Sequence, residues 1–413
     1  MQLRVLLLCA TTLCATTRIA AGEEHPATGP EREWSVLPAL GYNPDTGLDI
    51  GVFTHVVQLD PEVHPYRWRV RGQVQTSILF EDGIELPRYE HYLRLDLPGL
   101  PDEESRLRLD VTWKRQLNVG YFGVGNDSRA GDPAVDGDGY HEFRAESLRG
   151  KVILERQLGR PAWRGLTGVE LEHVDVDTYG GSLLAHDVAL ARNAGEEVAG
   201  TGLFTLLVFQ LGLVLDTRDH ETFPTRGLFH DLVVRAAPSS GDGTAWGGLT
   251  YTTRFYVPIF EDDVVVATRA LGDVLVGDAP LMELARYGGL LPAEALGGSD
   301  GVRGITGGRF IGKTKILGNA ELRALLLPFR LFREDMNLGA AAFFDTGRVW
   351  TDTLAPDRDL DGSGLGLHWG AGAGARLRWG DALLVRLDAA HSPNTKDFGG
   401  GPVAIYLTAD GGF

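Results

Sequence analysis

The chain has 413 residues, 43% of them hydrophobic and 23% charged, and its formal net charge is -17. A chain this acidic is not expected to take nucleic acid or the surface of an anionic membrane as its ligand. After the N-terminal segment no run of about 18 or more apolar residues occurs, so a transmembrane helix is excluded and only a β-barrel could span a membrane.

Residues 1–21 have the pattern of a cleaved secretory signal peptide. Arg4 supplies a positive charge, residues 5–17 form an apolar or small-residue stretch, and residues 20–22 form a small-residue cleavage site. The protein is therefore expected to leave the cytoplasm.

Cys9 and Cys14 are the two cysteines of the chain, and both lie in this signal. We therefore expect a mature protein without disulfides. A lipoprotein signal at Cys14 is disfavoured, because Leu13 occupies the position where a small residue should precede a lipidated cysteine. Residues 22–33 are too few for a folded domain, which needs about 50 residues, so we expect a short periplasmic segment followed by one barrel domain at residues 34–413.

Charged and apolar residues alternate from residue 66 onward. Arg67, Arg69 and Arg71 occupy odd positions, and Trp68 and Val70 lie between them. Because successive side chains of a strand point to opposite faces, this pattern predicts a strand with one charged and one apolar face. The same pattern returns at residues 93–97, 106–114, 313–326 and 383–388.

We expect about sixteen antiparallel strands. They begin near residues 34, 47, 66, 87, 104, 141, 163, 201, 227, 246, 263, 313, 336, 365, 381 and 401. The strands of a soluble sandwich also alternate, but they usually run for about five to six residues, and these run longer. In a membrane barrel the apolar face meets lipid over about 10 residues and the charged face lines a wet lumen, so an all-β transmembrane antiparallel barrel is the favoured fold.

The connections between the expected strands alternate between long and short, as they do in outer-membrane barrels. The long ones follow odd-numbered strands, at residues 118–140, 177–200, 277–312 and 351–364, and tight links such as 258–262 and 379–381 follow even-numbered ones. Both termini should then face the periplasm, with the barrel in the outer membrane of a Gram-negative cell. No repeat of about 20 to 50 residues is visible, which disfavours a propeller.

Residues 296–305 read Leu-Gly-Gly-Ser-Asp-Gly-Val-Arg-Gly-Ile and lie in the long connection between the eleventh and twelfth expected strands. Val302, Arg303 and Gly304 closely resemble the signature loop of the BamA/TamA superfamily of outer-membrane barrels, in which V-R-G precedes an aromatic residue. Ile305 departs from that pattern.

Further motifs follow in the order of that family. Residues 216–219 and 224–227 resemble its periplasmic turn into the ninth strand. Gly318 and Glu321 match its twelfth-strand motif, Phe343, Asp345 and Gly347 its thirteenth-strand motif, and Phe413 its C-terminal targeting signal. An ordinary last strand would show the same alternation over residues 403–413 without requiring the terminal aromatic residue.

The resemblance implies that the loop folds back into the barrel lumen, where Arg303 pairs with Asp345 and Glu321 lies nearby. Alternation independently places the side chains of Asp345 and Glu321 inside the barrel. A planar guanidinium suits an inward pair of carboxylates, because it can bind them through several parallel hydrogen bonds. The alternative is that Arg303 is a solvated loop charge.

The resemblance also implies a function in inserting or translocating proteins or lipids at the outer membrane, with the lumen plugged by the loop and outer-membrane lipid as a partner. Family members carry periplasmic POTRA domains, which we do not expect before this barrel, so a separately encoded periplasmic partner or a homodimer stays open. A passive, porin-like channel is one alternative function. An outer-membrane hydrolase built on His391, Ser392 and Asp388 is another, and it is disfavoured because Ser392 adjoins Pro393 at a strand end.

We expect no metal site, no cofactor and no catalytic residues. Asp357, Asp359, Asp361 and Gly362 begin like a calcium-binding loop, but His368 occupies the position of the required glutamate, so an acidic solvated loop is expected. Asp132, Asp136 and Asp138 are interpreted in the same way. The glycines at 370, 372 and 374 lack the lysine of a phosphate-binding loop and are expected to allow close strand packing or a bend.

Overall fold

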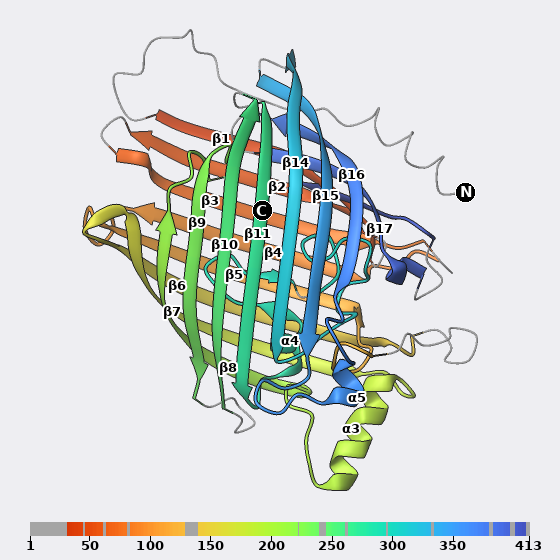
Figure 1. Ribbon diagram of the computed structural model, residues 1–413. Coiled ribbons are helices and arrows are strands. Elements are labelled where there is room, and N and C mark those ends of the chain that lie inside the picture. Colours follow the sequence, from red (N-terminus) through yellow and green to blue (C-terminus); the bar gives the residue numbers. More distant parts are fainter. Residues whose placement is uncertain are drawn as a thin grey trace.

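The computed structural model describes residues 31–409, apart from 44–45, 61–62, 81–82, 129–138, 222, 239–244, 261–262, 295, 332–333, 380–382 and 397–400. In this part of the chain sixteen antiparallel strands close into a barrel (Figure 1). The last strand returns to pair with the first. The predicted all-β barrel is confirmed. The expected signal peptide, residues 22–30 behind it and Phe413 lie outside the described residues.

Each barrel strand begins within three residues of its predicted start. The strands are β1 (Glu31–Asn43), β2 (Gly47–Asp60), β3 (Val63–Ile78), β4 (Arg88–Pro98), β5 (Ser105–Gly120), β6 (Glu142–Leu158), β7 (Arg160–Thr178), β8 (Gly202–Asp216), β9 (Gly227–Ala237), β10 (Trp246–Phe260), β11 (Val264–Gly277), β14 (Thr314–Leu331), β15 (Glu334–Trp350), β16 (His368–Trp379), β17 (Leu383–His391) and β18 (Ala404–Ala409). Several exceed the length of ordinary soluble strands, with 19 residues in β7.

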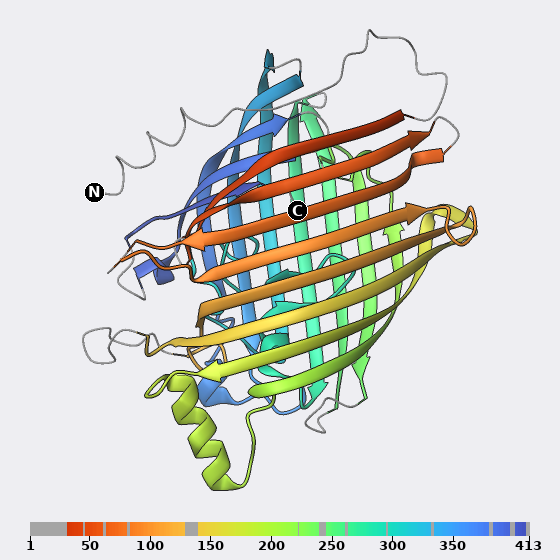
Figure 2. The same cartoon turned by 180° about the vertical axis from the view of Figure 1, so that it is seen from behind.

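The remaining elements lie in the connections. They are α3 (Leu183–Ala194) after β7, then α4 (Leu281–Leu284), β12 (Arg286–Tyr287) and β13 (Ala293–Glu294) between β11 and β14, α5 (Arg358–Asp361) after β15, and the 3-10 helix η2 (Pro393–Lys396) after β17. Helix α3 projects from one end of the barrel, as both views show (Figures 1 and 2). Within the described ranges no helix combines the length and the apolar composition that crossing a membrane requires.

The outer face of the barrel is apolar, as the alternation predicts. In β8, Leu203 and Leu211 are 67% exposed, whereas Leu206 between them is 1% exposed. A row of exposed leucine side chains is unfavourable in water but favourable in the hydrocarbon core of a membrane. This outward face is therefore the one that contacts lipid.

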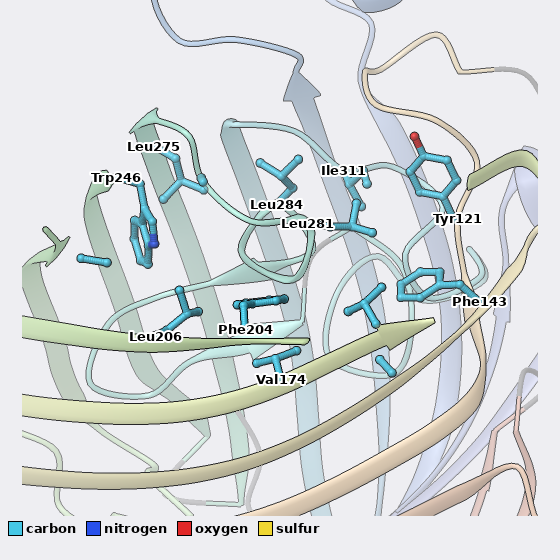
Figure 3. Packing of buried hydrophobic residues seen from close by; sticks show 14 of the residues in the cluster. Tyr121, Phe143, Val174, Phe204, Leu206, Trp246, Leu275, Leu281, Leu284 and Ile311 are labelled. Atoms are coloured by element: carbon cyan, nitrogen blue, oxygen red, sulfur yellow. The ribbon is translucent and has the colours of Figure 1, made fainter. Parts of the chain in front are cut away.

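The lumen face is not charged along its whole height, which corrects our expectation that a charged face lines a wet lumen. At the end that carries α3, inward residues of β6, β7, β8, β10 and β11 form an apolar cluster (Figure 3). Its members include Phe143, Val174, Phe204, Trp246 and Leu275. These side chains need no water, because Leu281, Leu284 and Ile311 of the β11–β14 connection pack against them inside the barrel.

The connection between β11 and β14, residues 278–313 apart from residue 295, lies inside the barrel. Tyr287, Leu296 and Ile305 of this segment are fully buried. They pack in one cluster with Leu271 of β11 and Leu317 of β14, whose side chains point inward. We call residues 278–313 the lumen segment.

Candidate functional site

Arg303 lies at the centre of a buried ion-pair network in the lumen, with only 2% of its side chain exposed. Its Nε donates to Asp345 Oδ2 at 2.7 Å and its Nη2 donates to Asp345 Oδ1 at 2.9 Å, so the pair is bidentate. Its Nη1 donates to Glu321 Oε1 at 2.6 Å and to Asp388 Oδ2 at 3.2 Å. One guanidinium thus joins the lumen segment to β14, β15 and β17.

The alternation of the strands explains why these carboxylates converge. Asn319, two residues before Glu321 on β14, is paired with Asp345 of β15, and both strands direct these positions into the lumen. Asn319 Nδ2 also donates to Asp345 Oδ1 at 2.8 Å. The carboxylates are therefore presented on rigid sheet, and only the lumen segment has to be positioned.

Two further arginines balance the charge of the network. Arg376 of β16 pairs with Asp388 and, at 3.5 Å, with Glu321. Arg323 of β14 pairs with Glu321 at 2.7 Å. Three guanidinium groups therefore face three carboxylates, which lowers the cost of keeping them away from water.

The charged form of Arg303 is strongly favoured in this setting. Burial alone would lower the pKa of its guanidinium, but the hydrogen bonds and charge of Asp345, with the charges of Glu321 and Asp388, raise that pKa above its ordinary value. The guanidinium carbon also lies 3.5 Å from the centre of the Phe343 ring, a cation–π contact. The neighbouring Gly304 N donates to Tyr406 Oη of β18 at 3.1 Å, which extends the contact to a fourth strand.

Glycines in the wall let the lumen segment come this close. A Cβ at Gly370 of β16 would collide with the carbonyl oxygen of Arg303, and a Cβ at Gly347 of β15 would collide with the side chain of Leu296. Gly304 itself has φ +94°, a backbone conformation that favours glycine. The strand is therefore closely packed at Gly370, as expected, and the group that packs there is the backbone of Arg303.

The structure brings together most of the residues singled out in the sequence. Val302 is fully buried in the apolar cluster beneath Arg303, as is Ile305, the residue that departs from the pattern of the resemblance. Gly318 lies apart from the network, on the outward face, where a Cβ would only touch Thr346 at 3.6 Å. Asp388 was missed as a partner of Arg303, although the alternation of β17 already placed it on the lumen face.

The hydrolase alternative is not assembled by the fold. Asp388 points into the lumen, where Arg303 and Arg376 bind it. His391 is three positions further along β17, on the opposite face, and its Nδ1 lies 2.7 Å from the carbonyl oxygen of Pro402. Ser392 Oγ accepts a hydrogen bond from Asn394 N. The three side chains therefore do not meet.

In the acidic stretch at 357–361, Asp357 and Asp359 are exposed, as expected of a solvated loop, but Asp361 is buried. Asp361 is 3% exposed, and it accepts hydrogen bonds from Thr351 N at 2.7 Å and Thr351 Oγ1 at 3.0 Å. Asp357 accepts from Asp359 N at 2.8 Å and caps α5. These carboxylates stabilise the loop because they satisfy backbone donors.

Among the described residues no group of three or more histidine, cysteine, aspartate or glutamate side chains could hold a metal ion. Asp132, Asp136 and Asp138 lie outside the described residues.

Comparisons with known proteins show the family and the fold of the chain. Residues 90–397 match the model of the Omp85 superfamily domain. Among solved structures, BamA from Haemophilus ducreyi lacking POTRA domains 1-3 has 12% identity and a TM-score of 0.56, over 92% of this chain and 70% of that one. CdiB from Escherichia coli has 16% identity and a TM-score of 0.57, over 92% of this chain and 63% of that one, so this chain spans less than two thirds of its length. Both likenesses show a shared fold, and no curated protein sequence matches the chain.

Replacing Arg303 should destabilise the barrel. We expect Arg303→Ala to lower the free energy of unfolding by about 3 to 5 kcal/mol, because three buried carboxylates would lose their shared cation. Arg303→Lys should recover only part of this, since an ammonium cannot form the bidentate pair. Urea-induced unfolding in detergent micelles measures both. The control is Arg156→Ala, which removes a side chain that is 58% exposed and should lower the free energy of unfolding by less than about 1 kcal/mol. If Arg303→Ala lowered it by no more than this control does, the Arg303 network would not stabilise the barrel.

A methyl group at residue 370 should displace the lumen segment. We expect Gly370→Ala to lower the free energy of unfolding by about 1 to 3 kcal/mol and to expose residues 278–313 to protease, because the new Cβ would overlap the backbone of Arg303. Gly272→Ala of β11 is the matched control, since a Cβ there meets no atom within 4 Å. Equal protease resistance of both variants would show that the close approach at Gly370 does not matter.

Proposed function

Since the chain belongs to the Omp85 superfamily, we propose that this outer-membrane barrel inserts or translocates proteins or lipids, and that the lumen segment closes its pore until a client arrives. The observation that carries the proposal is the position of the lumen segment, which Arg303 joins to three strands of the wall. A barrel built as a permanently open pore would have no need to bury a charge network of this kind beneath its longest described connection.

Closure is supported along two parts of the wall. Around Arg303, the inward side chains of Glu321, Asp345 and Asp388 are 4% exposed or less. At the end that carries α3, the apolar cluster around Phe204 and Trp246 excludes water. A hydrated path through either region would require these side chains to separate.

A passive channel is the second candidate, and one observation favours it. The inward side chains of β3 and β4 are less covered than those of β14 to β17, with Arg94 38% exposed and Arg71 and Gln73 half-buried. A porin-like path would run along this side of the lumen. The two candidates differ in the effect that removal of the lumen segment has on the current.

Conductance measurements test closure directly. Residues 279–312 are replaced by a short glycine-serine turn, which can join β11 to β14 because the two strands are paired from Val274 opposite Thr314 onward. We expect small or flickering currents from the wild type in a planar bilayer and a large steady current from the shortened barrel. Equal steady currents from both proteins, each shown to be folded by its heat-modifiable migration, would favour the passive channel.

We place both termini in the periplasm and α3 outside the cell, because long connections are extracellular in outer-membrane barrels. The apolar outer face then contacts outer-membrane lipid. A separately encoded periplasmic protein or a second copy of the chain is the proposed further partner, since the resemblance links such barrels to periplasmic client delivery.

Cysteine labelling tests this orientation, and the chain suits it because Cys9 and Cys14 lie in the expected signal. We expect Glu197→Cys, at an exposed position in the β7–β8 connection, to react with a membrane-impermeant maleimide on intact cells. Glu104→Cys, in the β4–β5 link with 62% of the native side chain exposed, should react only after the outer membrane is permeabilised. The reverse pattern would invert the proposed topology.

A further inference from the structure

A second ion-pair network holds the lumen segment twenty residues before Arg303, at Glu283 of α4. Glu283 Oε2 accepts from Arg235 Nη1 of β9 at 2.7 Å, and its Oε1 accepts from Arg286 Nε at 2.9 Å. The side chain of Glu283 is 1% exposed. The start of the lumen segment is therefore tied to a part of the wall that Arg303 does not touch.

Arg286 carries this contact across the lumen. Its Nη2 donates to Glu172 Oε2 of β7 at 3.0 Å and lies 3.4 Å from Glu170 Oε1 of the same strand. In the sheet, β7 is separated from β11, where the lumen segment begins, by β8, β9 and β10. Arg286 thus bridges from the root of the lumen segment to a distant part of the barrel wall.

The end of the lumen segment is bound to the same network. Lys315 of β14 pairs with Asp273 of β11 at 2.9 Å, and its Nζ donates to the carbonyl oxygens of Glu283 at 3.1 Å and Gly312 at 3.3 Å. Asp273 also accepts from Arg235 Nη2 at 2.9 Å. Both Lys315 and Asp273 have fully buried side chains.

The backbone between these points is equally constrained. Leu290 N donates to Asp231 Oδ2 of β9 at 2.6 Å. Gly289 has φ +96°, and a Cβ at Gly288 would collide with the guanidinium of Arg235. The residues from Glu283 to Leu290 are therefore fitted against β9 by charge, hydrogen bonds and close approach together.

The charges of this second network are balanced. Arg235, Arg286, Lys315 and Lys151 face Glu170, Glu172, Asp273 and Glu283, with Lys151 Nζ 3.6 Å from Glu170. The charges of Arg286 and Arg235 lower the pKa of Glu283 to about 2, although burial alone would raise it. Removing one member leaves an unpaired buried charge, which is costly.

We propose that the lumen segment has two anchors, the Arg303 network on β14, β15 and β17 and the Glu283–Arg286 network on β7, β9, β11 and β14, and that either one is enough to keep the pore closed. The inference rests on the proposed function. The two anchors meet on β14, through Glu321 and Lys315, and on β11, where Arg269 donates to Asn319 and to the carbonyl oxygen of Asp300 and Asp273 belongs to the second anchor. The apolar cluster of Leu281 and Leu284 reinforces the second anchor alone. Loss of Arg303 then frees the residues around position 303, while the start of the lumen segment at Glu283 and Arg286 stays bound across the lumen. Full opening of the pore therefore requires the loss of both networks.

Single-channel recording of Arg303→Ala, Arg286→Ala and the double variant tests the two anchors, with the shortened barrel as the fully open reference. We expect each single variant to flicker, and the double variant to stay open at least about tenfold longer than either, a difference of about 1.4 kcal/mol between the double variant and each single variant. Arg144→Ala is the control, because it removes an arginine paired with Asp175 at 3.1 Å outside both networks, and it should behave as the wild type.

Each outcome separates the two claims. The two-anchor proposal is wrong if Arg303→Ala alone reproduces the steady current of the shortened barrel. It is also wrong if the double variant stays as closed as the wild type while the shortened barrel conducts. In both cases the lumen segment would still close the pore. If the shortened barrel conducts no more than the wild type, the proposed closure itself is wrong. If the double alanine variant does not fold, the isosteric Glu283→Gln combined with Arg303→Lys keeps side-chain volume and is expected to give the same order of open times.

Discussion

Buried charge is the constraint on which the interior of this barrel depends. A guanidinium or carboxylate that leaves water must be met by an opposite charge and by hydrogen bonds, or the folded state loses several kcal/mol. In the lumen that requirement is met by pairing wall residues with the connection between β11 and β14. Arg303 with Asp345 and Arg286 with Glu172 are examples. The wall and the lumen segment therefore complete each other electrostatically, and neither would be satisfied alone.

Shape and hydrophobicity set the rest of the arrangement. Glycine at positions 347 and 370 removes the Cβ atoms that would otherwise keep the lumen segment away from β15 and β16. At the end that carries α3 the lumen is dry, because Leu281 and Leu284 pack on inward aromatic side chains such as Phe204. A membrane barrel usually combines a lipid-facing apolar surface with a wet interior. Here a second apolar region lies inside, where the lumen segment packs against it.

The barrel was accessible from the sequence because strand alternation is a local pattern, and the contact of Arg303 with Asp345 was expected from the resemblance of residues 302–304 to a family motif. Alternation gave the strand positions and the inward direction of Glu321 and Asp345, and the V-R-G resemblance supplied the loop partner. The same alternation placed Asp388 in the lumen, yet no motif marked it as a partner of Arg303. Within the acidic stretch at 357–361 only Asp361 departs from the expected solvated state, since a carboxylate that accepts backbone hydrogen bonds, as Asp361 does from Thr351, has the same sequence appearance as a solvated one.

By itself the sequence determined the strand count, the side of the sheet on which each residue lies, and the family motif of the lumen segment, because a period of two is a property of the strand alone. Only the tertiary structure decided that Glu283 and Arg286 meet Arg235 and Glu172, that Asp388 joins Arg303, and that one end of the lumen is apolar. Arg286 and Glu172, for example, lie more than one hundred positions apart in the sequence. Their partners are set by the closure of the sheet and by the path of the lumen segment, and no local pattern encodes either.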